Sequence, residues 1–127
     1  RGSGAYASMA RRLEEAFAAS GAPPLVQAAG HDHNLQVIDL AGTGPSGYQL
    51  VSGSASRTTR VRRIDGMRYA TDGFGYMRVD FEGRAVRLWV YARDVDGGPV
   101  GTVFTCALVS TEGGSDCPEA PLTAGGP

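Results

Sequence analysis

The sequence contains no lysine: all twelve of its basic residues are arginine. Thirteen acidic residues leave a formal net charge of −1, so the chain has no overall basic field to attract nucleic acid or anionic lipid. It also lacks an apolar run of about 18 residues, the length that a transmembrane helix requires. We therefore expect neither nucleic acid nor a membrane among its partners.

Cysteine is scarce as well. The only two, Cys106 and Cys117, enclose ten residues that include Gly113-Gly114. A disulfide across this flexible loop would stabilise the fold by roughly 2–3 kcal/mol on the chain-entropy model. It would also favour an exported protein, secreted or periplasmic. The alternative is a buried strand thiol at Cys106 and a free thiol at Cys117.

Glycine is abundant, at 19 residues, which suits many turns between short strands. The first segment, in contrast, has apolar residues at helical spacing and cannot continue as a helix past Pro23-Pro24. We expect one amphipathic helix of about four turns here, with an apolar stripe that needs a sheet to cover it. The stripe consists of Tyr6, Met9, Leu13 and Phe17.

The pattern of the remaining residues predicts strands and turns. Polar and apolar residues alternate most clearly over 75–81 and 85–91, which Glu82-Gly83 joins as a hairpin. Neighbouring strands with tight turns are expected to pair antiparallel. The other strand candidates are residues 25–29, 35–40, 48–52, 67–70 and 100–109.

This order of elements predicts half of a layered α/β architecture: one helix, then a mainly antiparallel sheet. We expect a single folded unit over residues 1–110. The loose composition of residues 111–127, rich in glycine and proline, predicts a flexible tail.

The only two histidines, His31 and His33, follow Gly30 directly after the first expected strand. In an extended segment, side chains two apart point the same way, so both imidazoles could face one metal site. Gly30 would permit a turn that a Cβ would obstruct. Two histidines are too few for a tight site, because ions such as zinc need further protein ligands. The alternative is that both histidines cap a turn on the surface.

The segment Gly30-His31-Asp32-His33-Asn34-Leu35-Gln36 resembles the last motif of the calcineurin-like metallophosphoesterases, and is closest to their purple (tartrate-resistant) acid phosphatase branch. Three downstream segments, residues 51–56, 72–79 and 87–91, are similar to later parts of that family. The resemblance extends from about Tyr6 to Leu108.

The resemblance implies the C-terminal half of a four-layer α/β/β/α metallophosphoesterase sandwich. Its activity would be hydrolysis of phosphate monoesters by a metal-activated hydroxide at a dinuclear site. His31 would bind one ion and His33 the other, while Gly30 and Asn34 would organise the loop behind them. The ions would be iron, zinc or manganese. A phosphodiesterase or nucleotidase of the same fold is the alternative.

The family's other motifs, an Asp-x-His, a Gly-Asp pair, a Gly-Asn-His and a lone His, belong to its first half and are absent from this sequence. The resemblance therefore implies that the chain alone is inactive and that its partner is the N-terminal half of the same enzyme, with a phosphate ester as substrate. The alternative from another class of function is a non-catalytic β-rich binding module in which the histidine pair is incidental.

Two further groups of side chains have open interpretations. A basic cluster could bind a phosphorylated or acidic substrate, or form a solvated strand face. Four aromatic residues could line a ligand surface or pack in the core. The basic cluster is Arg57, Arg60, Arg62, Arg63 and Arg68, and the aromatic residues are Tyr69, Tyr76, Trp89 and Tyr91.

Overall fold

The computed structural model describes residues 4–41, 47–94 and 97–120 of the chain. Within these residues a single helix, α1 (Gly4–Ser20), precedes all the strands, so the fold is mainly β with one helix. The predicted order of elements is confirmed. The strands are β1 (Val26–Ala29), β2 (Leu35–Asp39), β3 (Tyr48–Ser52), β4 (Met67–Thr71), β5 (Phe74–Glu82), β6 (Ala85–Asp94) and β7 (Gly97–Val109).

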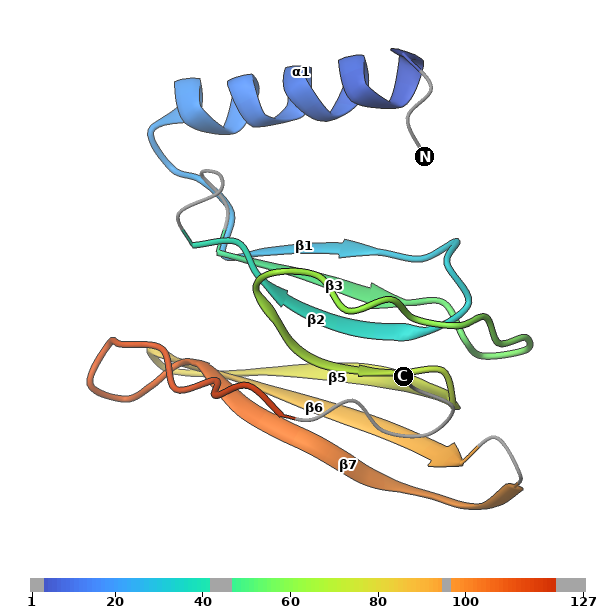
Figure 1. The fold of residues 1–127 in the computed structure, drawn as a ribbon. Coiled ribbons are helices and arrows are strands. Elements are labelled where there is room, and N and C mark those ends of the chain that lie inside the picture. Colours follow the sequence, from blue (N-terminus) through green and yellow to red (C-terminus); the bar gives the residue numbers. More distant parts are fainter. Residues whose placement is uncertain (1–3, 42–46, 95–96, 121–127) are drawn as a thin grey trace.

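The strands form two sheets where the sequence predicted one mainly antiparallel sheet. A mixed sheet has the order β1-β3-β2-β4, and an antiparallel sheet has the order β5-β6-β7. Figure 1 shows three layers, with α1 over the mixed sheet and the antiparallel sheet on its other side. Consecutive strands do pair antiparallel at β5–β6 and β6–β7. The longer β1–β2 loop imposes no such pairing, and β3 lies between these strands, parallel to β1.

The core lies between the two sheets. Val86, Leu88 and Val90 of β6 are buried, and they form one apolar cluster with buried residues of the mixed sheet. Tyr69 of β4 stacks on Phe104 of β7 with ring centroids 4.8 Å apart, so this aromatic residue belongs to the core. The buried residues of β6 thus alternate along the strand, as the sequence pattern over 85–91 indicated.

The other three aromatic residues lie on the outer face of the antiparallel sheet. Trp89 and Tyr91 alternate with the buried residues of β6, which places their side chains on the opposite face. Tyr76 of β5 is directly across from Tyr91 in the ladder. These residues remain half-buried or exposed, because the mixed sheet covers the other face.

The chain crosses from the mixed sheet to the antiparallel sheet in the short turn between β4 and β5. A Cβ on Gly75 would lie 2.0 Å from the carbonyl oxygen of Tyr91 and 2.9 Å from Leu35 Cδ1. Only glycine leaves room for this approach of the backbones. The position therefore helps to bring the two sheets to packing distance.

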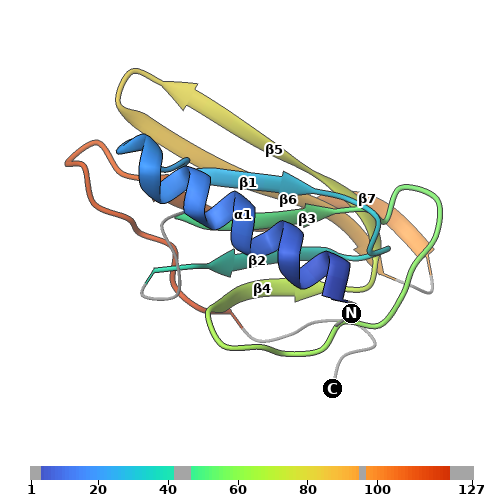
Figure 2. The same ribbon diagram turned by 90° about the horizontal axis from the view of Figure 1, so that it is seen from above.

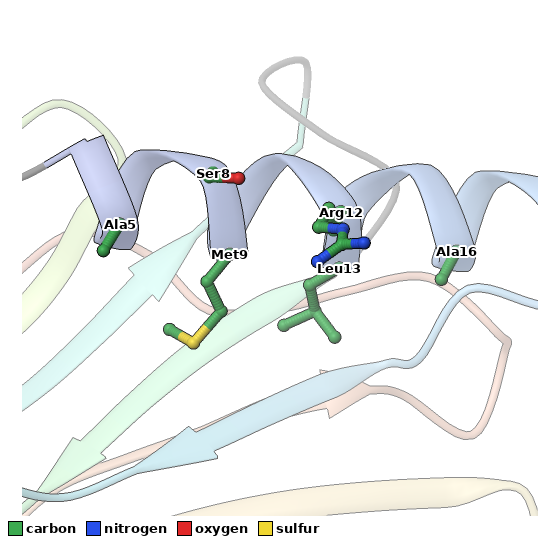
Figure 3. A pocket seen from close by; sticks show the side chains of 6 residues that line it. All are labelled: Ala5, Ser8, Met9, Arg12, Leu13 and Ala16. Carbon is green, nitrogen blue, oxygen red and sulfur yellow. The ribbon is translucent and has the colours of Figure 1, made fainter.

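Helix α1 runs across the outer face of the mixed sheet (Figure 2) but does not pack tightly on it. No residue of α1 is buried. Met9 and Leu13 point toward the sheet (Figure 3) yet keep 59% and 44% of their surface exposed. The predicted apolar stripe thus lies over a sheet without being covered by it. No helix in the described part of the chain is long and apolar enough to cross a membrane.

Residues 111–120 have a defined path alongside β7. A disulfide joins Cys106 to Cys117, the pairing that the sequence favoured, and both residues are buried. Ala107 and Asp116 exchange two backbone hydrogen bonds in an isolated β-bridge next to it. The disulfide and the bridge together attach this segment to the antiparallel sheet.

The same segment also reaches the mixed sheet. The hydroxyl of Ser115 hydrogen bonds to that of Tyr48, and the amide of Ala120 donates to the carbonyl of Arg68 at 2.6 Å. The first part of the predicted tail is therefore folded back against both sheets. Residues 121–127, the rest of the predicted tail, lie outside the described residues.

The predicted basic cluster is divided among different surroundings. Arg68 Nη2 lies 2.8 Å from Asp39 Oδ2 across the β2–β4 pair. Burial acts to raise the pKa of Asp39, but hydrogen bonds from Arg68 and from the amide of Ala41 outweigh it and hold that pKa below its ordinary value. Arg63 pairs with Glu119. The remaining three, Arg57, Arg60 and Arg62, are exposed in the loop between β3 and β4.

Candidate functional site

The two histidines lie in the loop that joins β1 to β2, which we call the His loop (residues 30–34). Strands β1, β3 and β4 run in the same direction within the mixed sheet, so their carboxyl ends lie at the same end of the sheet. We call this end the carboxyl edge. In open α/β sheets, ligands bind beyond the carboxyl ends of the parallel strands. The His loop therefore lies at the edge where a binding site is expected.

The backbone of the His loop is not extended. The amide of Asp32 donates to the carbonyl of Gly30 at 3.0 Å, and the amide of Asn34 donates to that of Asp32 at 2.8 Å. His31 has a φ of 76°, in the left-handed region. The rule that residues two apart point the same way holds only for extended chain, so it does not place the two imidazoles here.

Glycine is required next to the His loop, although not where the sequence suggested. A Cβ on Gly30 would meet nothing closer than the carbonyl oxygen of Ser52 at 4.0 Å, so the expectation of an obstructed turn was wrong. On Gly53, at the end of β3, a Cβ would lie 2.1 Å from the carbonyl oxygen of Asp32. The close approach thus involves the neighbouring segment, which the sequence could not reveal.

Asn34 fixes the base of the His loop. It is only 3% exposed, and its Nδ2 donates to Thr59 Oγ1 at 3.4 Å while its Oδ1 accepts from Gln36 Nε2 at 2.7 Å. Its carbonyl accepts from the amide of Gly53 at 3.1 Å, and the carbonyl of His33 accepts from the amide of Thr59 at 2.7 Å. Asn34 therefore holds the loop against two other segments of the chain.

The two imidazoles differ in their surroundings. The side chain of His31 is 92% exposed, with Nδ1 at 3.7 Å from Asp32 Oδ1. His33 is half-buried. Within residues 4–41, 47–94 and 97–120, no group of three or more His, Cys, Asp or Glu could hold a metal ion. This part of the chain offers two donors of a suitable type but no complete metal site.

Two buried polar side chains that the sequence did not single out lie near the same edge. Leu35 pairs with Thr71 at the end of the β2–β4 ladder, so Asn34 and Asp72 each lie one residue beyond the last pair. Asp72 is 8% exposed and Ser54 is fully buried. Asp72 Oδ1 and Ser54 Oγ have no hydrogen-bond partner among the described residues. An unpaired buried polar atom costs about 1–3 kcal/mol, so both atoms are unfavourable for the stability of the fold.

Substituting Gly53 tests the structure of the His loop. Gly53→Ala is expected to lower the free energy of unfolding by about 2 kcal/mol, because its Cβ forces the backbone away from Asp32. Gly30→Ala is the matched control, with an expected change below about 1 kcal/mol, since a Cβ has room there. Urea denaturation measures both. Equal effects of the two substitutions would contradict the loop structure.

Comparison of the chain with known proteins identified no relative. No protein family, curated protein or solved structure matches the chain. The resemblance of the His loop to metallophosphoesterases therefore stays a prediction, which depends on the residues of the loop and on the edge that it occupies.

Proposed function

We propose that this chain is the C-terminal portion of a dinuclear metal-dependent phosphoesterase that hydrolyses phosphate monoesters. The observation that carries the proposal is the His loop, which brings two imidazoles to the carboxyl edge of the mixed sheet. Imidazole nitrogen is a suitable donor for iron, zinc and manganese. When bound, two such ions would neutralise phosphoryl charge and promote ionisation of water.

The residues of this chain would bind and orient in that site. His31 would hold one ion and His33 the other, so that a single short loop sets their separation. Asn34 supports this role through its hydrogen bonds to Thr59 and Gln36, which fix the loop without occupying an imidazole nitrogen.

The other ligands would come from the N-terminal half of the enzyme, either continuous with this chain or as a second polypeptide. Strand β1 pairs on one side only, with β3, in the described structure. Its free edge could pair with a further strand, since an open edge presents unpaired backbone groups. The exposed Met9 and Leu13 of α1 offer an apolar surface above the same sheet.

Two finer features belong to the same proposal. The helix and the two sheets would be part of a four-layer α/β/β/α sandwich, with the N-terminal half contributing the rest. The disulfide between Cys106 and Cys117 supports folding in an oxidising compartment, so the protein would be secreted or periplasmic.

The native protein, purified from its source without reducing agent, tests the proposal. Intact mass is expected to show a longer chain or a second polypeptide, and elemental analysis about two metal ions per His loop. This preparation should hydrolyse p-nitrophenyl phosphate, whereas the isolated 127-residue chain should not. Faster hydrolysis of bis(p-nitrophenyl) phosphate would favour the phosphodiesterase alternative. Absence of both metal and hydrolysis would reject the proposal.

A non-catalytic binding module is the second candidate. The near-complete exposure of His31 favours it, as does the lack of a three-ligand group in the described ranges. This candidate predicts that the native protein contains no bound metal and hydrolyses neither phosphate ester. The experiment above separates the two candidates.

A further inference from the structure

We propose a second binding site, for a flat aromatic ring with an anionic substituent, on the outer face of the antiparallel sheet. A hollow of about 550 Å³ lies there, at the end of the sheet where β5 begins. Pockets that bind small molecules have volumes of about 300–1,000 Å³, so one ring with its substituent fits. The side chains that line it belong to Ala55, Ser56, Phe74, Tyr76, Arg93 and Val100.

Arg93 supplies the positive charge of the site. It is directly across from Phe74 in the β5–β6 ladder, and its guanidinium carbon lies 5.1 Å from the centroid of that ring. Among the side chains that the structure describes, no carboxylate forms an ion pair with Arg93. A guanidinium stacked in this way keeps its N–H groups free for a carboxylate or phosphoryl group.

Tyr76 supplies a flat wall that is already in position. Its ring stacks on Tyr91, with centroids 5.0 Å apart and planes at 21°. The guanidinium of Arg78 lies 5.5 Å from the centroid of Tyr91, and Asp80 holds Arg78 with Nε–Oδ1 at 3.0 Å. Tyr76 is nevertheless 53% exposed. A ring held on one side and open on the other can stack a planar ligand with little loss of conformational entropy.

The hollow lies close to the His loop. Gly53 donates to the carbonyl of Asn34 at 3.1 Å, and only Ser54 separates it from Ala55 in the lining. Two residues of chain span at most about 7 Å. If the proposed function holds, on which this step depends, the hollow would receive a planar anionic leaving group while the phosphoryl group reaches the His loop. Binding in the hollow itself does not depend on that function.

Calorimetric titration of the 127-residue chain with phenylphosphonate, without added metal, tests the site. We expect saturable binding of one molecule per chain. Arg93→Gln should weaken it at least about tenfold, because the charged hydrogen bonds are lost. Arg84→Gln is the matched control and should have no effect, since Arg84 is in the β5–β6 turn at the other end of these strands. Inorganic phosphate and cyclohexylphosphonate should bind at least about tenfold more weakly than phenylphosphonate, because neither has a flat ring.

A second variant and a second measurement locate the ligand. Tyr76→Leu keeps apolar bulk but removes the flat wall, so it should abolish the preference for phenyl over cyclohexyl. Amide shifts in NMR spectra should change at Gly75, Tyr76 and Arg93. Absence of saturable binding, equal losses in Arg93→Gln and Arg84→Gln, or shifts confined to other surfaces would overturn the proposal. Phenylphosphonate binding by this chain, together with a native protein that lacks metal and hydrolysis, would reject the proposed function alone.

Discussion

Alanine at both His31 and His33 is expected, under the proposed function, to remove the metal ions of the proposed phosphoesterase and to lower its turnover by about a thousandfold or more. The reason is that each imidazole would hold one of two ions, and loss of either leaves the phosphoryl charge unneutralised. Elemental analysis and kcat for p-nitrophenyl phosphate, measured on the native assembly, check this prediction.

Asp32→Asn is the matched control for the histidine variants. Asp32 lies between the two histidines in the same loop, and its side chain is 68% exposed. Asp32 is not expected to bind metal, so the Asp32→Asn variant should keep the original metal content. Its kcat should stay within about twofold, a difference of well under 1 kcal/mol in activation free energy. Unchanged metal content and turnover in the double alanine variant would rule out the metal-binding role of the His loop.

Removal of the disulfide by Cys106→Ala together with Cys117→Ala is expected to lower the free energy of unfolding by about 3 kcal/mol. The bridge closes a short loop, and its loss restores conformational freedom to the unfolded chain. Both residues are buried in the cluster between the sheets, so their replacement also removes packing. For a chain of this size the corresponding fall in Tm is about 10 °C.

Thermal unfolding with and without dithiothreitol provides the control for this prediction. The reductant should lower the Tm of the original chain and leave that of the double alanine variant unchanged, because the variant has no disulfide to reduce. Ser115→Ala, which removes only the hydrogen bond to Tyr48 in the same segment, should cost about 1 kcal/mol. An equal response of both proteins to the reductant would contradict the assigned bridge.

Local pattern was sufficient to locate most elements of secondary structure. The strand expected at 48–52 is β3, and the hairpin expected around Glu82-Gly83 is that of β5 and β6. The hairpin prediction succeeds because alternating polar and apolar residues and a tight turn are local signals. The covering of α1 was not predictable in this way. A periodic apolar stripe shows that a helix has an apolar face, but not whether this chain covers it.

The candidate site could be predicted only in part from the sequence. The histidine pair is visible as a motif, whereas the left-handed backbone of His31 and the close contact of Gly53 arise from turns and neighbours. Asp72 had no recognisable spacing to any other candidate. Its place at the end of the β2–β4 ladder depends on the register between these strands.

One amphipathic helix, the approximate strands, a histidine pair after the first strand and a pair of cysteines that enclose ten residues could all be inferred from the amino-acid order alone. Each of these depends on residues near one another in the chain, where spacing and turn propensity act directly. Only the tertiary structure decided that there are two sheets, that β1 is parallel to β3, and that residues 55–56 meet β5 and β6 around a hollow. Such neighbours are distant in sequence, and strand register and the packing of one sheet on another bring them together.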